Sequence, residues 1–487
     1  MNDKQKLILN RKHATIKNRE AINSLVYDSY KGGFHYTSQN HLHQHSLESD
    51  FDYNKRAERS IFISHTRTLI DILIGFIFDT EIKRNIPEKI DYIKTNATPT
   101  QSLSSFIQKT ATLSSLFTCA VLVDSPTFNS EDVKSIKDRE DKGLNPYCKR
   151  YTVFNIQDFS LDEMGKLNWI LFNDNYLNTT DPFQENIEVI CRTLWTKTEC
   201  TKFYYKKSNK GEIEFDYEEI IPHNLKEVPV ILTSFRDIED DKFNDSFSEN
   251  LALLDRSVYN YLSLLDVCLS KNAIKPLMYP SKSGEVPESL KDASQLSKLT
   301  VIPYPQDTTN KPFYLEATNT DIQSYLETIQ MLLEFAKESI GLSKSEKIAV
   351  SGKAKQVELR KLQVILKQGA QNLQDLENEI LRLVCKWESK DLDYKIEYPS
   401  EFDSDDTEQL LTRLYDLLTI DSETLRTEAI KQITTISLPD IERDKIELII
   451  NEVNSSESFN LEDPELDNDN NNDEDIKPQS ISSKTEK

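Results

Sequence analysis

The sequence predicts an α+β chain, mainly α, that forms an elongated subunit of a larger assembly. Residues 246–389 contain three long amphipathic helical patterns, and residues 187–232 contain strand patterns separated by turn signals. Hydrophobic residues make up 37% and charged residues 29% of the 487 residues. Ordinary globular domains contain about 45–50% apolar residues, glycine included. Much of this chain must therefore be surface, as in elongated subunits packed side by side.

The charge balance gives no sign of tight nucleic-acid binding. The chain has 59 basic and 82 acidic residues and a net charge of -23. A protein that grips nucleic acid needs a basic stripe, and none is apparent in the chain as a whole. The acidity equally suits an ordinary soluble protein. The six cysteines form no CxxC pair and the N-terminus shows no signal-peptide core, so we expect a reducing cytoplasm.

The first part of the chain, to residue 245, is expected to mix short helices and strands. Apolar spacing predicts a helix over residues 57–78, with Ile61 and Ile63 on its apolar face. The longest apolar stretch, residues 69–78, is shorter than the roughly 20 residues of a membrane helix, so no membrane span is expected. Residues 115–123 are typical of a buried strand, and residues 187–232 predict a hairpin-rich subdomain.

Three long helices are expected after residue 245. The first begins at a capping box formed by Ser246 and Glu249 and ends near residue 275, before Pro276. Residues 276–317 hold six prolines and the segment LTVIPY, which predicts a compact loop-and-strand insertion. The second helix covers residues 321–340 and ends at Gly341, and an eleven-residue loop leads to the third, residues 353–389.

The C-terminal part is expected to contain a small helical cap and a disordered tail. Helices are predicted near residues 406–420 and 422–433, with a shorter one ending near residue 453. Residues 454–487 are rich in Asp, Asn, Ser and Glu and have almost nothing apolar to bury.

The sequence gives no positive reason to predict an enzyme or a cofactor. The segment KIAVSGKA, residues 347–354, is similar to the end of a phosphate-binding loop, but it lacks the first glycine and the magnesium-binding Ser or Thr. The segment DNDNNNDED, from residue 467, lacks the glycine and glutamate of a calcium loop. Neither segment is therefore predicted to bind its ligand.

A histidine cluster is the remaining candidate for metal chemistry. His41, His43 and His45 alternate in HLHQH and would share one face of a strand, an arrangement that zinc could use. The favoured interpretation is a solvated loop, because the surrounding stretch is polar and contains no cysteine. A metal-dependent nuclease or transferase that uses this cluster is the alternative, and no metal site is predicted.

Several segments resemble the portal proteins of tailed bacteriophages. They are residues 30–33 (YKGG) with the following helices, residues 119–126 (CAVLVDSP), residues 253–284 and residues 349–363 (AVSGKAKQVELRKLQ). The resemblance covers about residues 25–390. A glycine that is usual before the strand segment is replaced by Phe117-Thr118.

The resemblance implies the portal fold. Its parts would be a wing (1–245), stem helix 1 (246–273), a clip (274–317), stem helix 2 (318–341), a tunnel loop (342–352), a long helix returning to the wing (353–403), a crown (404–453) and an acidic tail (454–487). The stem would pack through Leu254, Val258, Leu265, Ile329 and Leu333.

The resemblance also implies a function in the virion. The chain would form a dodecameric ring at one capsid vertex, through which double-stranded DNA passes without sequence specificity. Its partners would be the terminase large subunit, the major capsid and scaffold proteins and a head-to-tail adaptor. Lys344, Lys347, Lys353 and Lys355 would face the DNA, with Gly341 and Gly352 as loop hinges. The alternative is a cytosolic helical adaptor or scaffold without a channel.

Overall fold

The computed structural model contains both helices and sheets, which confirms the α+β class. It describes residues 2–79, 81–126, 144–179, 183, 187–207, 212–236, 243, 248–273, 277–282, 285, 301–306, 319–342, 352–399, 402, 423–437, 445–446 and 448–450. The chain divides into two units, Met1–Phe402 and Asp403–Lys487.

Short helices form the N-terminal segment of the first unit. They are α1 (Asp3–Asn10), α2 (Ala14–Asn18), α3 (Glu20–Lys31), α4 (Gly33–Thr37), α5 (Asp50–Arg59) and α6 (His65–Asp79). Helix α1 begins at a capping box in which the side chains of Asn2 and Gln5 accept from each other's backbone amides. Helix α5 begins at Ser49, whose hydroxyl accepts from the Asp52 amide.

The single helix predicted over residues 57–78 is wrong, because the chain is extended between α5 and α6. Ile61 and Ile63 are exposed, whereas Phe62 between them is buried and stacks on Tyr36 with ring centroids 3.5 Å apart. Burial that alternates at every residue is typical of extended backbone, not of a helix. The helical prediction fails here because this part of the apolar run has a period of two.

Four β-sheets are present in the described residues, and three of them belong to the body of the first unit. Strand β2 (Cys119–Asp124) lies between β10 (Val230–Thr233) and β3 (Tyr147–Tyr151), and both pairings are antiparallel. The larger sheet has the order β4 (Ile156–Leu161), β5 (Leu167–Asn173), β7 (Ile187–Thr196), β8 (Glu199–Lys207) and β9 (Ile213–Pro222), and β6 (Tyr176–Asn178) also pairs with β7. Strand β1 (Lys83–Asn85) pairs with β13 (Lys395–Glu397). The hairpin-rich subdomain expected over residues 187–232 is confirmed.

The strand expected over residues 115–123 is correct only in its second half. Ser115 and Leu116 end helix α8 (Leu103–Leu116), which starts at the cap residue Ser102, and β2 begins three residues later. The end of the helix and the strand are both buried and therefore both apolar, so hydrophobicity alone does not show the boundary between them. Two short helical turns, η1 (Glu88–Ile90) and α7 (Tyr92–Thr95), precede α8.

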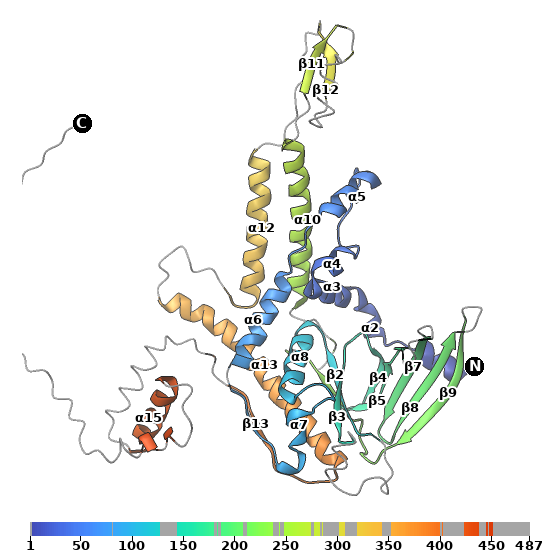
Figure 1. Cartoon of the computed structure of the whole chain (residues 1–487), viewed down its shortest axis with the longest axis vertical. Helices are drawn as coiled ribbons and strands as arrows, with labels where there is room; N and C mark the ends of the chain where they lie inside the picture. Colours follow the sequence, from blue (N-terminus) through green and yellow to red (C-terminus); the bar gives the residue numbers. More distant parts are fainter. Residues whose placement is uncertain are drawn as a thin grey trace, which may run out of the picture. The chain divides into compact units, whose positions relative to one another are not determined.

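Two long helices of the first unit lie side by side and extend from its body (Figure 1). They are α10 (Ser248–Ala273) and α12 (Asn319–Ser339), and their ends agree with the predicted helices to within two residues. Strands β11 (Leu277–Ser281) and β12 (Val301–Pro305) pair in parallel at the far end of the helices. Ser246, the expected N-cap of α10, lies outside the described residues.

Helix α13 (Gly352–Trp387) passes through the main core and connects its parts. Its 36 residues span about 54 Å. Helical spacing predicts a buried stripe of eight residues on this helix, and seven of them are buried: Leu362, Leu366, Ala370, Leu373, Leu376, Ile380 and Leu383. The eighth, Trp387, is partly buried against the same core. Because this stripe packs with residues of α6, α8 and β2, the helix holds the helical and sheet regions together.

The second unit contains helix α15 (Glu423–Ser437), which covers most of the helix expected over residues 422–433. Ala429 and Ile430 are buried in it. The helix predicted near residues 406–420 and the acidic tail 454–487 lie outside the described residues.

Candidate functional site

The helix pair formed by α10 and α12 is the candidate functional site. Val258 and Leu265 of α10 are buried against Ile329 of α12, and Leu333 packs on this cluster. The rings of Tyr261 and Tyr325 extend the contact, with centroids 6.2 Å apart. Leu254, also expected in the stem, instead packs at the edge of the main core. Four of the five residues expected to pack the stem therefore meet in one cluster.

The two helix ends that lie near the body, the start of α10 and the end of α12, are held by hydrogen bonds. The Ser248 hydroxyl, at the start of α10, donates to the Ser115 carbonyl at the end of α8. At the end of α12, Gly341 adopts φ +79°, and its amide donates to the Glu338 carbonyl over 3.1 Å. The Leu342 amide donates to the Lys337 carbonyl over 2.9 Å. These two bonds form the Schellman motif that ends many helices at a left-handed residue.

Gly341 also lies directly against α13. A Cβ atom at this position would stand 2.7 Å from the Leu362 amide nitrogen and 3.1 Å from the Leu362 Cα. Glycine is therefore required here both by the left-handed backbone and by the close approach of two helices. Gly352, the second expected hinge, is the first residue of α13.

The expected channel lysines can be placed only in part. Lys344 and Lys347 lie outside the described residues. Lys353 and Lys355 belong to the first turn of α13, where the structure describes the backbone alone. The hypothesis that these four lysines face DNA therefore stays a prediction.

A buried arginine holds α5 against the side of α10 that faces away from α12. The Arg56 side chain is 2% exposed, and its guanidinium donates to both carboxylate oxygens of Glu48, at 2.7 and 2.6 Å. It also donates to the Ser263 hydroxyl of α10 over 2.8 Å and to the His43 carbonyl over 2.6 Å. The hydrogen bond to Arg56 holds the pKa of the Glu48 carboxyl below its usual range.

Asp255 of α10 explains where α6 begins. Its buried carboxylate accepts from the Thr66 amide at 2.9 Å, from the Thr66 hydroxyl at 2.7 Å and from the His65 ring at 2.9 Å. The carboxylate therefore acts as an N-cap supplied by a distant helix. No local sequence signal could have identified it, because about 190 residues separate it from the helix that it caps.

Another buried ion pair joins α13 to the β1–β13 ribbon. Glu377 is completely buried and accepts two hydrogen bonds from Arg84, at 2.8 and 2.7 Å. The Tyr398 hydroxyl donates to the same carboxylate. Sequence reasoning missed this group as well, since its members are remote from one another in the chain.

The three histidines of HLHQH do not form the zinc arrangement considered above. His41 is directed to Asp28, with its Nε2 2.9 Å from the carboxylate, whereas His43 and His45 are exposed. His35 contacts the other oxygen of Asp28 at 2.8 Å. Within the described ranges, no group of three His, Cys, Asp or Glu side chains could hold a metal ion.

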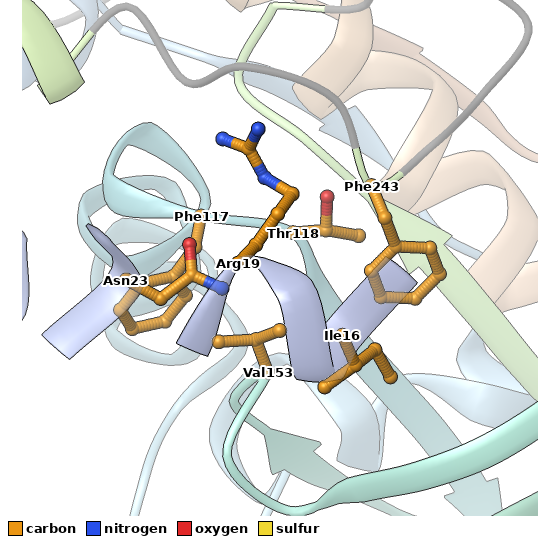
Figure 2. Close-up of a pocket in the computed structure, with 7 residues that line it drawn as sticks. All are labelled: Ile16, Arg19, Asn23, Phe117, Thr118, Val153 and Phe243. Atoms are coloured by element: carbon orange, nitrogen blue, oxygen red, sulfur yellow. The ribbon is translucent and has the colours of Figure 1, made fainter. Parts of the chain in front are cut away.

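Two of the cavities in the described part of the chain lie beside buried polar or titratable side chains. Figure 2 shows the first, which is lined by Ile16, Arg19, Asn23, Phe117, Thr118, Val153 and Phe243. Its volume of about 10 Å³ has room for about one water molecule. The Arg19 guanidinium is directed away from the apolar lining and pairs with Glu249 of α10. This cavity therefore belongs to the packing of the N-terminal helices against residues 117–118, 153 and 243.

The second cavity, of about 230 Å³, lies among Asp124, Trp195, Cys200, His223 and Trp387. Burial raises the pKa of Asp124, raises the pKa of Cys200 to about 12 and lowers the pKa of His223. All three shifts favour the uncharged forms. Because the thiolate is the reactive form of cysteine, this cavity does not provide an activated nucleophile.

Comparison with known protein families finds no family model that matches the chain, and no curated protein matches it either. Among the helices in the described part of the chain, none is long and apolar enough to cross a membrane.

Proposed function

We propose that the chain is the portal subunit of a tailed bacteriophage. Twelve copies form a ring at one vertex of the capsid, terminase packages double-stranded DNA through the ring, and the DNA later leaves by the same channel. The ring also contacts the major capsid and scaffold proteins and a head-to-tail adaptor.

The observation that carries this proposal is the order of elements around the helix pair. Helix α10 leaves the α/β body, the β11–β12 pair lies at the far end, α12 returns, and α13 crosses the body (Figure 1). This is the order of wing, stem, clip, stem and long helix that the sequence resemblance implies. A helix pair anchored at its base by Ser248 and Gly341 is suited to stand beside identical pairs around a channel.

The charge of the chain suits a conduit that DNA slides through. Affinity for DNA grows with the number of phosphates that a protein neutralises. A net charge of -23 keeps that general attraction low. Lysines near the start of α13 would supply weak, salt-screened contacts that hold the duplex and release it.

Electron microscopy of the purified full-length chain tests the proposal. We expect rings with a central hole and a mass of about twelve subunits. A stable monomer at micromolar concentration would contradict the proposal and support the alternative, a cytosolic helical adaptor.

The DNA contacts need a separate measurement. Replacing Lys344, Lys347 and Lys353 together with alanine is expected to leave the rings intact and to reduce DNA packaging or retention in a reconstituted packaging assay. Undiminished packaging and retention would exclude these lysines as channel contacts.

A further inference from the structure

The cavity of about 230 Å³ described above lies where four elements of the first unit meet, and we call it the tryptophan cavity. Asp124 is the last residue of β2, Trp195 belongs to β7, and Trp387 is the last residue of α13. His223 directly follows β9. The other lining residues are Ser125, Pro126, Cys200, Ile221 and Pro222. The cavity is partly open to solvent, so a ligand can enter it.

Three aromatic rings adjoin one another in the lining. The centroid of the His223 ring is 5.6 Å from that of Trp195 and 5.9 Å from that of Trp387. Hydrogen bonds hold two of the rings: Trp387 Nε1 donates to the Val123 carbonyl over 2.8 Å, and His223 Nε2 donates to the Thr196 carbonyl over 3.2 Å. Aromatic rings attract cations to their faces, and indole does so most strongly. This lining therefore favours a cationic group over an anion.

The charge of the lining points in the same direction. Asp124 is the only acidic residue among the lining residues that the structure describes, and none of them is lysine or arginine. Its carboxylate accepts from the Ser125 amide over 2.8 Å and from the Tyr147 hydroxyl over 3.0 Å. A carboxylate has about four positions for hydrogen-bond donors, so these two bonds leave room for a ligand.

Two lysines act on Asp124 electrostatically, but neither lines the cavity. Each pairs with another carboxylate: Lys149 with Asp174 over 2.7 Å, and Lys202 with Glu219 over 3.9 Å. Burial raises the pKa of Asp124, because a charged group loses hydration there. A cation bound in the cavity would supply the opposite charge that makes burial of this carboxylate favourable.

We propose that the tryptophan cavity binds a guanidinium group, the head group of arginine. A guanidinium is flat and stacks on aromatic rings, and its N–H groups donate in a fixed plane to a carboxylate. An ammonium is more strongly hydrated, so moving it into a cavity lined by indole, proline and isoleucine side chains costs more. An apolar cavity of about 150 Å³ holds a benzene molecule, so this cavity has room for the guanidinium and its adjoining methylene groups. This site is separate from the helix pair, and it goes beyond the proposed function.

Blocked amino acids test the proposal on the full-length chain without any substitution. N-acetyl-arginine methylamide is the probe, and isothermal calorimetry and tryptophan fluorescence are the measurements, because two of the three tryptophans line the cavity. We expect saturable binding of the arginine probe, and binding about tenfold weaker or less for the citrulline probe, which has the same shape without the charge. Free arginine is measured beside it, and the tighter of the two shows whether a protein side chain or a small molecule is the source.

Asp124→Asn removes the charge and keeps the shape of the side chain. We expect it to weaken binding of the arginine probe about tenfold or more. Asp216→Asn is the matched control, because Asp216 is exposed on β9 and pairs with Lys206 outside the cavity. It should bind the probe as the unaltered chain does.

The probes also distinguish the proposal from a folding defect in the variant. Equal binding of the arginine and citrulline probes to the unaltered chain would overturn the proposal, because the charge would then have no part in recognition. Equal binding of the lysine probe would exclude a site specific for guanidinium. The absence of saturable binding by either form of arginine, or unchanged affinity in Asp124→Asn, would also overturn it.

Discussion

Substituting alanine for Gly341 tests how tightly α12 is joined to α13. The left-handed backbone at φ +79° costs alanine roughly 1 kcal/mol more than glycine. The added methyl group would stand 2.7 Å from the backbone nitrogen of Leu362, and such overpacking costs roughly 1–3 kcal/mol. The two contributions predict a loss of about 2–4 kcal/mol in the free energy of local opening.

Hydrogen exchange measured by mass spectrometry is the suitable assay, because it reports opening at a chosen segment. Amides at the end of α12 and around Leu362 are expected to exchange about 30-fold to 1,000-fold faster in Gly341→Ala. Gly165→Ala is the control, because Gly165 has φ +76° but no atom within 4 Å of its added methyl group. The control should lose only about 1 kcal/mol, and only at its own turn. Equal losses in the two variants would refute the argument from close packing.

Three further predictions concern single residues. Ser389, two residues beyond the end of α13, has φ +51°, so Ser389→Gly should stabilise the chain by about 0.5–1 kcal/mol in thermal unfolding, and no gain would contradict backbone strain at this position. Glu377→Gln leaves Arg84 without its carboxylate and should cost roughly 3–5 kcal/mol; a loss below 1 kcal/mol would mean that the pair adds little. The lowered pKa of Glu48 gives stability that is present above its unfolded pKa and lost as pH falls through its folded pKa. Glu48→Gln should therefore reduce the loss in the free energy of unfolding as the pH falls into the acid range. An unchanged loss would exclude the ion pair with Arg56 as its source.

The sequence predicts the three long helices and the hairpins well because burial imposes a strong period on each. In α13, Leu362, Leu366 and Leu373 recur at helical spacing, and each is buried in the core. The predicted end of this helix, Ser389, is two residues past its last helical residue, Trp387. In the sheets, the residues that pair across β7 and β8 follow one another in the chain, so local alternation was sufficient.

The prediction failed where a boundary depends on a distant residue. Residues 57–78 were assigned to one helix because their apolar content is continuous, and the break at residues 60–64 is fixed by Asp255 in α10. The expected capping box at the start of α10 illustrates the reverse problem. Glu249 has the spacing of a capping residue, but in the structure its carboxylate pairs with Arg19. A short motif cannot show whether its side chains have a stronger partner elsewhere in the fold.

The candidate site shows the same difference between features that local spacing predicts and features that depend on distant contacts. The cluster of Val258, Leu265 and Ile329 was predictable because apolar spacing shows which side of a helix is buried. The same spacing cannot show a side that an isolated subunit leaves exposed, and Phe335 therefore has no role in the predicted stripe of α12. The 48% exposure of Phe335 is visible only in the fold, and whether another copy covers that side chain is a question for measurements of assembly.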